Sequence, residues 1–173
     1  MSKIPVEKLK QIPPKRLLKL INKAKEYLKG NEVMQEMCKE FGVDIDVIDL
    51  IPVRFGDLDV SAQTRKGVVI LNYKLLADGD FFKDLQYLIH EFKHYISQVY
   101  GKKPTPGADD GEYLDNPEEQ EGFQWQLQYI EDQFGKDEAE DYVENLLDHH
   151  DIDNDDEREE KKDILMERVE DEE

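Results

Sequence analysis

Residues 81–101 read FFKDLQYLIHEFKHYISQVYG, and this stretch predicts the centre of the fold. Its apolar residues recur at helical spacing and form a wide stripe, which is typical of a helix buried in a core. The stripe consists of Phe81, Phe82, Leu85, Leu88, Ile89, Phe92, Ile96 and Val99. We expect Asp78 or Asp80 to cap this helix and Gly101 to end it.

The same helix carries the pattern H-E-x-x-H, formed by His90, Glu91 and His94. Two imidazoles at positions i and i+4 project from one face of a helix, so both can bind one zinc ion. Glu91 lies about 100° around the helix from His90. It can therefore reach a zinc-bound water without being a ligand, accept its proton and return that proton to a leaving amine. The pattern predicts that His90 and His94 bind zinc and that Glu91 is catalytic.

The third zinc ligand is expected from the next helix, which should begin at Asn116. This helix offers three carboxylates, Glu118, Glu119 and Glu121, and its buried stripe should consist of Phe123, Leu127, Ile130 and Phe134. Glu119 falls about 50° from the centre of that stripe, whereas Glu118 and Glu121 fall about 150° away. We therefore predict that Glu119 is the ligand. A helix cap is the competing role for Glu119, and Glu121 or Glu118 is the alternative ligand.

These residues resemble the gluzincin class of zinc metallopeptidases, in particular the small bacterial and phage-encoded ImmA/IrrE-like peptidases. The resemblance covers about residues 53–130 and is carried by GVVILN (67–72), HEFKH (90–94) and EQEG (119–122). It implies a minimal zincin-like fold and a zinc cofactor bound by His90, His94 and Glu119. It also implies that Glu91 is the general base or acid and that the substrate is a peptide or protein.

The chain departs from this family at Lys93, Gly122 and Phe123, where the family commonly has Gly, Ala and Asn or Asp. In such enzymes the strand before the zinc helix commonly presents an unpaired edge to an extended peptide. By resemblance, the strand within 67–72 has the same role here. Main-chain pairing would then provide affinity that does not depend on substrate sequence.

Two further helices are expected near the N-terminus. Pro13 and Pro14 open an amphipathic pattern that Gly30 closes. Asn31 should cap a second helix that ends at Gly42.

The period of the apolar residues changes to two between residues 43 and 73, which indicates strands. Arg65, Lys66 and Gly67 predict a turn before a returning strand at 68–71. The predicted fold class is therefore α+β, with a small antiparallel sheet or hairpin packed on a helical bundle around the zinc helix.

Composition limits the partners that this chain can have. It has 173 residues, 42 of them acidic and 23 basic, which gives a formal net charge of −19. A surface this acidic repels nucleic acid and anionic lipid, so neither is an expected partner. The single cysteine, Cys38, excludes an internal disulfide and a cage of zinc thiolates. Because neither a secretory signal nor a membrane span is recognisable, we expect a cytoplasmic protein of unknown oligomeric state.

Charge and composition predict three segments. Residues 1–42 should be a basic helical segment, residues 43–147 the zincin-like domain, and residues 148–173 an acidic tail that is disordered or an exposed helix. Within the domain, a helix is expected at about 137–147. The stretch 102–115, rich in Pro, Gly and Asp, should be a functional or mobile loop.

Several alternatives remain open at this point. The histidines could be surface residues without a metal, or the zinc could be a structural clip in a non-catalytic interaction or regulatory protein. The basic residues 1–29 could bind nucleic acid or cover the cleft as a pro-segment. An oxyanion could be stabilised by a tyrosine or a histidine, the candidates being Tyr95, Tyr113, Tyr129, His149 and His150.

Overall fold

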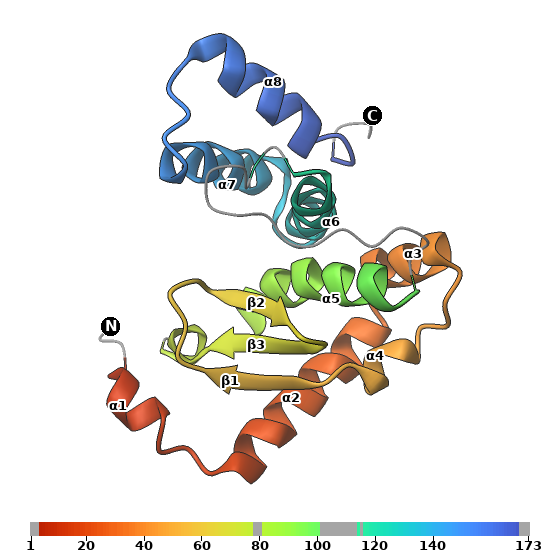
Figure 1. Ribbon diagram of the computed structural model, residues 1–173, viewed down its shortest axis with the longest axis vertical. Helices are drawn as coiled ribbons and strands as arrows, with labels where there is room; N and C mark the ends of the chain where they lie inside the picture. Colours follow the sequence, from red (N-terminus) through yellow and green to blue (C-terminus); the bar gives the residue numbers. More distant parts are fainter. Residues whose placement is uncertain (1–3, 78–80, 101–113, 115, 170–173) are drawn as a thin grey trace. The chain divides into compact units, whose positions relative to one another are not determined.

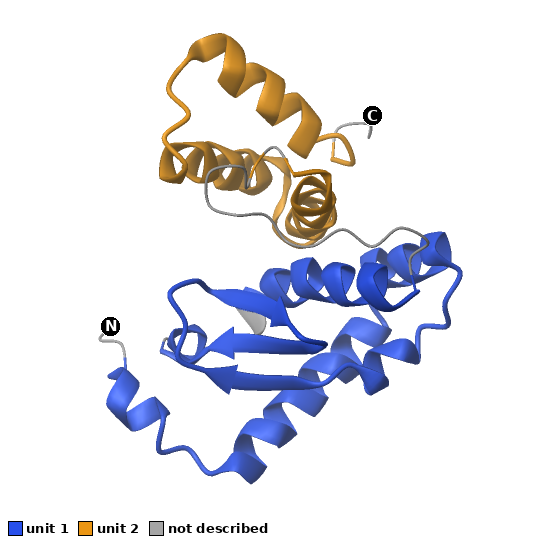
Figure 2. Ribbon diagram, viewed as in Figure 1, with its two compact units in different colours: residues 1–104 blue, residues 105–173 orange. Residues whose placement is uncertain are grey.

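The computed structural model of the chain describes residues 4–77, 81–100, 114 and 116–169. The chain divides into two compact units, Met1–Pro104 and Thr105–Glu173 (Figure 2). The first unit contains a sheet with helices, and the described part of the second is helical. The domain predicted at residues 43–147 therefore includes residues of both units.

The first unit begins with helices (Figure 1). In chain order they are α1 (Val6–Leu9), α2 (Pro14–Lys29) and α3 (Glu32–Phe41). The side chain of Asn31 accepts hydrogen bonds from the backbone N–H groups of Val33 and Met34. Gly42 ends α3 with φ of 70°, a left-handed conformation that glycine adopts without steric cost. The predicted limits of α2 and α3 are confirmed.

The sheet is mixed, not purely antiparallel as predicted. Its strands are β1 (Val53–Gly56), β2 (Ala62–Arg65) and β3 (Val68–Asn72), in the order β1-β3-β2. β2 pairs antiparallel with β3 through the predicted turn, in which Lys66 and Gly67 both have positive φ. β1 pairs with β3 in parallel. β3 is therefore central, which explains its continuous apolar sequence, and it has no free edge to offer a peptide. That prediction was wrong for β3.

The strand pattern also failed at residues 43–50, where the chain forms the short helix α4 (Val47–Leu50). The carboxylate of Asp44 accepts a hydrogen bond from Asp46 N–H, and the Asp44 carbonyl accepts one from Val47 N–H. Such Asp-initiated turns compete locally with extended backbone. The turn chemistry of Asp44 therefore outweighs the β propensity of Val47 and Ile48.

The predicted central helix is α5 (Leu85–Tyr100), which packs against β2, β3 and α3. Two short 3-10 helices precede it, η1 (Tyr73–Leu76) and η2 (Phe81–Asp84). Leu85, Ile89, Phe92 and Ile96 are fully buried, whereas Val99 at the end of the stripe is exposed. The proposed capping and ending residues, Asp78, Asp80 and Gly101, lie outside the described residues.

The second unit packs three helices pairwise: α6 (Pro117–Phe134), α7 (Lys136–His149) and α8 (Asp155–Leu165). Asn116 caps α6, as predicted, by accepting a hydrogen bond from Glu118 N–H. The core of this unit consists of Leu114, Phe123, Leu127, Ile130, Ala139, Val143, Leu147, Leu165, Met166 and Val169. Phe134, which the sequence placed in the buried stripe, is 51% exposed.

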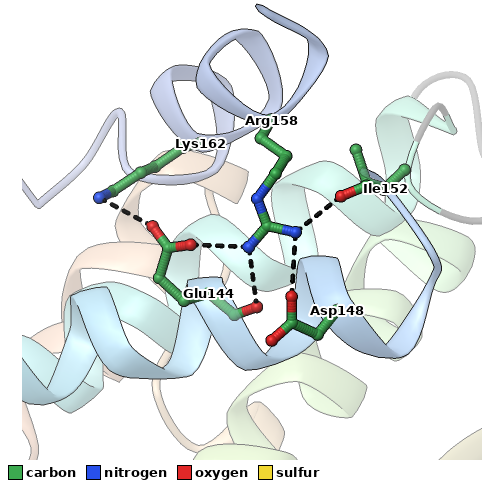
Figure 3. A network of polar contacts seen from close by, with 5 residues as sticks. All are labelled: Glu144, Asp148, Ile152, Arg158 and Lys162. Atoms are coloured by element: carbon green, nitrogen blue, oxygen red, sulfur yellow. Dashed lines mark hydrogen bonds and ion pairs between the residues drawn. The ribbon is translucent and has the colours of Figure 1, made fainter. Parts of the chain in front are cut away.

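The acidic tail was expected to be disordered or an exposed helix. It contains the helix α8, most of which is exposed, but Leu165 and Met166 at its end are buried in the core. The guanidinium of Arg158 donates hydrogen bonds to Asp148, to Glu144 and to the Ile152 carbonyl (Figure 3). The segment is therefore part of the second unit.

Among the described residues, no helix combines the length and the apolar character that a membrane crossing requires.

Candidate metal centre

His90 and His94 lie one turn apart on α5, as the pattern requires. Their ring centroids are 4.9 Å apart, with the ring planes inclined by 69°. Both side chains are buried, with 3% and 5% of their surfaces exposed. Buried polar groups are costly unless they have polar partners, so two buried imidazoles one turn apart suit a site that binds through their nitrogens.

Glu91 lies between these histidines in sequence and is also buried, at 6% exposure. Its carboxylate Oε1 accepts a hydrogen bond of 2.8 Å from the hydroxyl of Thr64 on β2. The Thr64 oxygen also lies 3.1 Å from the main-chain carbonyl oxygen of Glu91. Thr64 could not be predicted from the sequence, because the packing of β2 against α5 leaves no signature in the spacing of residues.

The three candidate carboxylates of α6 differ in burial. Glu119 is 6% exposed and Glu118 is 5% exposed, whereas Glu121 is exposed. The inward direction predicted for Glu119 agrees with this, but the outward direction predicted for Glu118 was wrong. Positions in the first turn of a helix lie close to the preceding chain, so the distance from an ideal stripe is a weaker guide there.

His90, His94 and Glu119 form a group that could hold a metal ion. One possible ligand atom from each residue lies within 4.8 Å of the others. Among the described residues, no second group of three His, Cys, Asp or Glu side chains has this geometry. The sequence had selected the same three residues.

The donor set suits zinc. Two imidazole nitrogens and one carboxylate oxygen are a common combination for zinc, and Ca²⁺ or Mg²⁺ would instead require mostly oxygen ligands.

Asn72, the last residue of the GVVILN motif, fixes the chain before β2. Its side-chain amide donates hydrogen bonds to the carbonyls of Leu58 and Val60, and its own N–H donates to the Ser61 carbonyl. Ser61 in turn hydrogen-bonds the side chain of Tyr87 on α5. The motif residue thus determines where β2, and with it Thr64, meets α5.

The residues considered for stabilising an oxyanion differ in burial and position. Tyr129 is buried at 2% exposure, and Tyr95 is half-buried. Tyr113 lies outside the described residues, as does nearly all of the predicted loop 102–115. His149 and His150 lie at the end of α7 with ring centroids 5.1 Å apart, and burial lowers the pKa of His150, with a further contribution from His149.

Comparisons of the chain with protein-family models, with curated proteins and with solved structures found no match.

Proposed function

We propose that this protein is a zinc-dependent peptidase in which His90, His94 and Glu119 bind the metal and Glu91 is the general base. The observation that carries the proposal is the combination of a three-residue ligand group with a buried carboxylate beside it that is not a member of the group. Glu91 has a separate partner, Thr64. This division into ligands and base is what hydrolysis by an activated water requires.

The chemistry needs one water molecule and one peptide bond. When bound, zinc supplies Lewis acidity, which polarises the peptide carbonyl and makes a water acidic enough to ionise near neutral pH. Glu91 accepts a proton from the attacking water as the new C–O bond forms. It then delivers this proton to the peptide nitrogen as the C–N bond breaks. The products are a carboxylic acid and an amine, so atoms and charges balance.

The number of ligands supports a catalytic role over a structural one. Structural zinc sites are closed by four protein ligands, whereas catalytic sites use three and keep one position open. Among the described residues, the group contains three. A non-catalytic protein with a zinc clip, the main alternative, would need a fourth ligand.

The sheet offers a route for binding an extended substrate. Because β3 is central, β1 and β2 are the edge strands, and β2 is the edge strand that contacts α5. An added peptide strand would pair with the main chain of β2. The peptide would then lie beside β2, whose Thr64 hydrogen-bonds Glu91.

The metal assignment is tested first by measuring the zinc content of purified variants. His94→Ala and Glu119→Gln should each lose most of the bound zinc. The matched controls are His149→Ala, an exposed histidine on α7, and Glu121→Gln, an exposed carboxylate on α6. Both controls should keep the metal. Equal zinc content in His94→Ala and the parent protein would refute the site.

The catalytic assignment is tested with Glu91→Gln. This variant should retain zinc and lose about 10²- to 10⁴-fold in kcat, the usual contribution of a general acid or base. The probe is a mixed library of unstructured peptides, with new amino termini detected by mass spectrometry. Cleavage by Glu91→Gln at the parent rate would exclude Glu91 as the base.

A further inference from the structure

The Glu91 carboxylate is tied to the edge of the sheet by one side chain. A threonine hydroxyl carries a single proton, and an ionised carboxylate can only accept, so Thr64 donates to Glu91 Oε1 across 2.8 Å. A hydrogen bond to a charged acceptor is stronger than one between neutral groups. The main-chain carbonyl of Glu91, at 3.1 Å, is a second acceptor for the same hydroxyl. Thr64 thus contacts both the backbone and the carboxylate of the same residue.

Thr64 is itself held in place from several directions. It pairs with Val69 in the β2–β3 ladder, next to the turn at Lys66 and Gly67. At the other end of β2, Asn72 binds the carbonyls of Leu58 and Val60. Threonine is also stiff about its first side-chain torsion, as are all β-branched residues. A donor with so little freedom can restrict the conformation of its acceptor.

We infer that Thr64 is the positioning residue of the general base, an inference that rests on the proposed function. A glutamate has three rotatable side-chain bonds, and proton transfer demands a narrow range of distances and angles. By holding Oε1, Thr64 selects one orientation of the carboxylate and leaves Oε2 to meet the water. Thr64 would act on the reaction through Glu91, the residue whose side chain and main chain its hydroxyl contacts.

The position of Thr64 on β2 gives the bond a second consequence. β2 is an edge strand, and the proposed function places the substrate along it. The residue that orients the base would therefore belong to the strand that pairs with the peptide. A displacement of β2 would therefore change the orientation of the Glu91 carboxylate through this hydrogen bond.

The kinetic test compares Thr64→Val with Thr64→Ser. Valine keeps the shape and the β-branch but has no hydroxyl, so the strand should still form. We expect Thr64→Val to lower kcat about 10- to 100-fold while KM changes less than about twofold, because misplacing a catalytic group impairs the transition state and not binding. Thr64→Ser restores the donor and should recover most of the loss. Zinc content should equal that of the parent in both variants.

Ser61→Ala is the matched control. It removes the other hydroxyl that joins this part of the chain to α5, through Tyr87, without contacting Glu91. We expect its kcat to stay within about twofold of the parent, since no catalytic group is misplaced. If Ser61→Ala lowered kcat as much as Thr64→Val does, the loss would come from a general loosening of the chain around β2, and the inference would fail.

A second measurement separates this inference from the proposed function. In the metal-free protein with ¹³C-labelled glutamate carboxyls, the Glu91 resonance is identified by its absence in Glu91→Gln. Loss of an ordered hydrogen bond in Thr64→Val should shift and broaden this resonance, and Thr64→Ser should not. An unchanged resonance in Thr64→Val would overturn the positioning role whether or not the protein is a peptidase. A protein without hydrolytic activity but with a shifted resonance would overturn the peptidase alone.

Discussion

Two helices, α5 of the first unit and α8 of the second, use polar side chains in opposite ways. On α5 of the first unit, His90, Glu91 and His94 are all buried, on a helix whose other buried positions are mostly apolar. In the second unit, Arg158 and Lys162 of α8 form ion pairs with Glu144 and Asp148 of α7, and these acceptors are 46% and 69% exposed (Figure 3).

The difference separates a chemical from a structural use of charge. Buried polar groups carry a desolvation cost, so a helix that retains several of them gives up stability at those positions. Exposed ion pairs cost little and contribute little individually, and they gain weight mainly as networks. We therefore expect the stability of each unit to come from its apolar core, with the Arg158 network as a smaller addition.

The largest expected effect is on the core of the first unit. Phe92 lies within the H-E-x-x-H stretch but is fully buried among apolar residues. Phe92→Ala should lower the free energy of unfolding by about 3–5 kcal/mol, through lost burial and the cavity left behind. Circular dichroism during urea unfolding measures this. Phe134→Ala, which truncates a phenylalanine that is 51% exposed, should change stability by less than about 0.5 kcal/mol.

The next effect tests whether the acidic tail belongs to a core. Leu165 at the end of α8 is fully buried, so Leu165→Ala should cost about 2–4 kcal/mol. Trp125, the single tryptophan, lies in α6 beneath the guanidinium of Arg168, so its fluorescence reports on the second unit. The control is Leu50→Ala, because Leu50 is 67% exposed. A fluorescence midpoint unchanged by Leu165→Ala would mean that α8 does not pack in solution.

Helix signals in this sequence were reliable where local chemistry determined the structure. Asn31, Gly42 and Asn116 mark helix ends by caps that act over three or four residues, and these caps form as predicted. Strand partners were not predictable in the same way. The parallel pairing of β1 with β3 depends on contacts far apart in sequence, which period-two spacing does not encode.

The buried end of the tail was not predicted, because the average composition of the tail hides its few apolar residues. Between residues 155 and 163 every side chain is charged, and the buried Leu165, Met166 and Val169 follow only at the end. Average charge indicates disorder, but a few apolar residues on one face are enough to dock a short helix.

The candidate site was predictable to the extent that helical geometry determines it. The selection of His90, His94 and Glu119 needed only the positions of residues on two helices, and the same three residues form the group that could hold a metal ion. Thr64 could not be selected, because its approach to Glu91 depends on how a strand packs across a helix. Residues that act through such packing can be identified only from the three-dimensional structure.

The smallest expected effect concerns the ion pairs that Arg158 and Lys162 form with Glu144 and Asp148. It tests the contrast between α8 and α5. The hydrogen bond from Arg158, and then that from Lys162, lowers the pKa of Glu144. A carboxyl whose pKa is lower in the folded than in the unfolded protein stabilises the fold above its unfolded pKa, near 4.3 on average. This stabilisation is lost as the pH falls through the folded pKa. Arg158→Met should therefore lower the urea midpoint of Trp125 fluorescence at pH 7 by less than Leu165→Ala does.

The pH dependence of that difference identifies its cause. The difference in urea midpoint between Arg158→Met and the parent should shrink as the pH falls below about 4, because protonated Glu144 no longer attracts the guanidinium. It should also shrink in high salt, which screens exposed charges. Glu144→Gln should reproduce the pH dependence, whereas Glu138→Gln, an exposed carboxylate earlier in α7, should not. A gap that is equal at pH 7 and pH 3 would show that Arg158 stabilises α8 through its bond to the Ile152 carbonyl and its aliphatic chain, and not through charge.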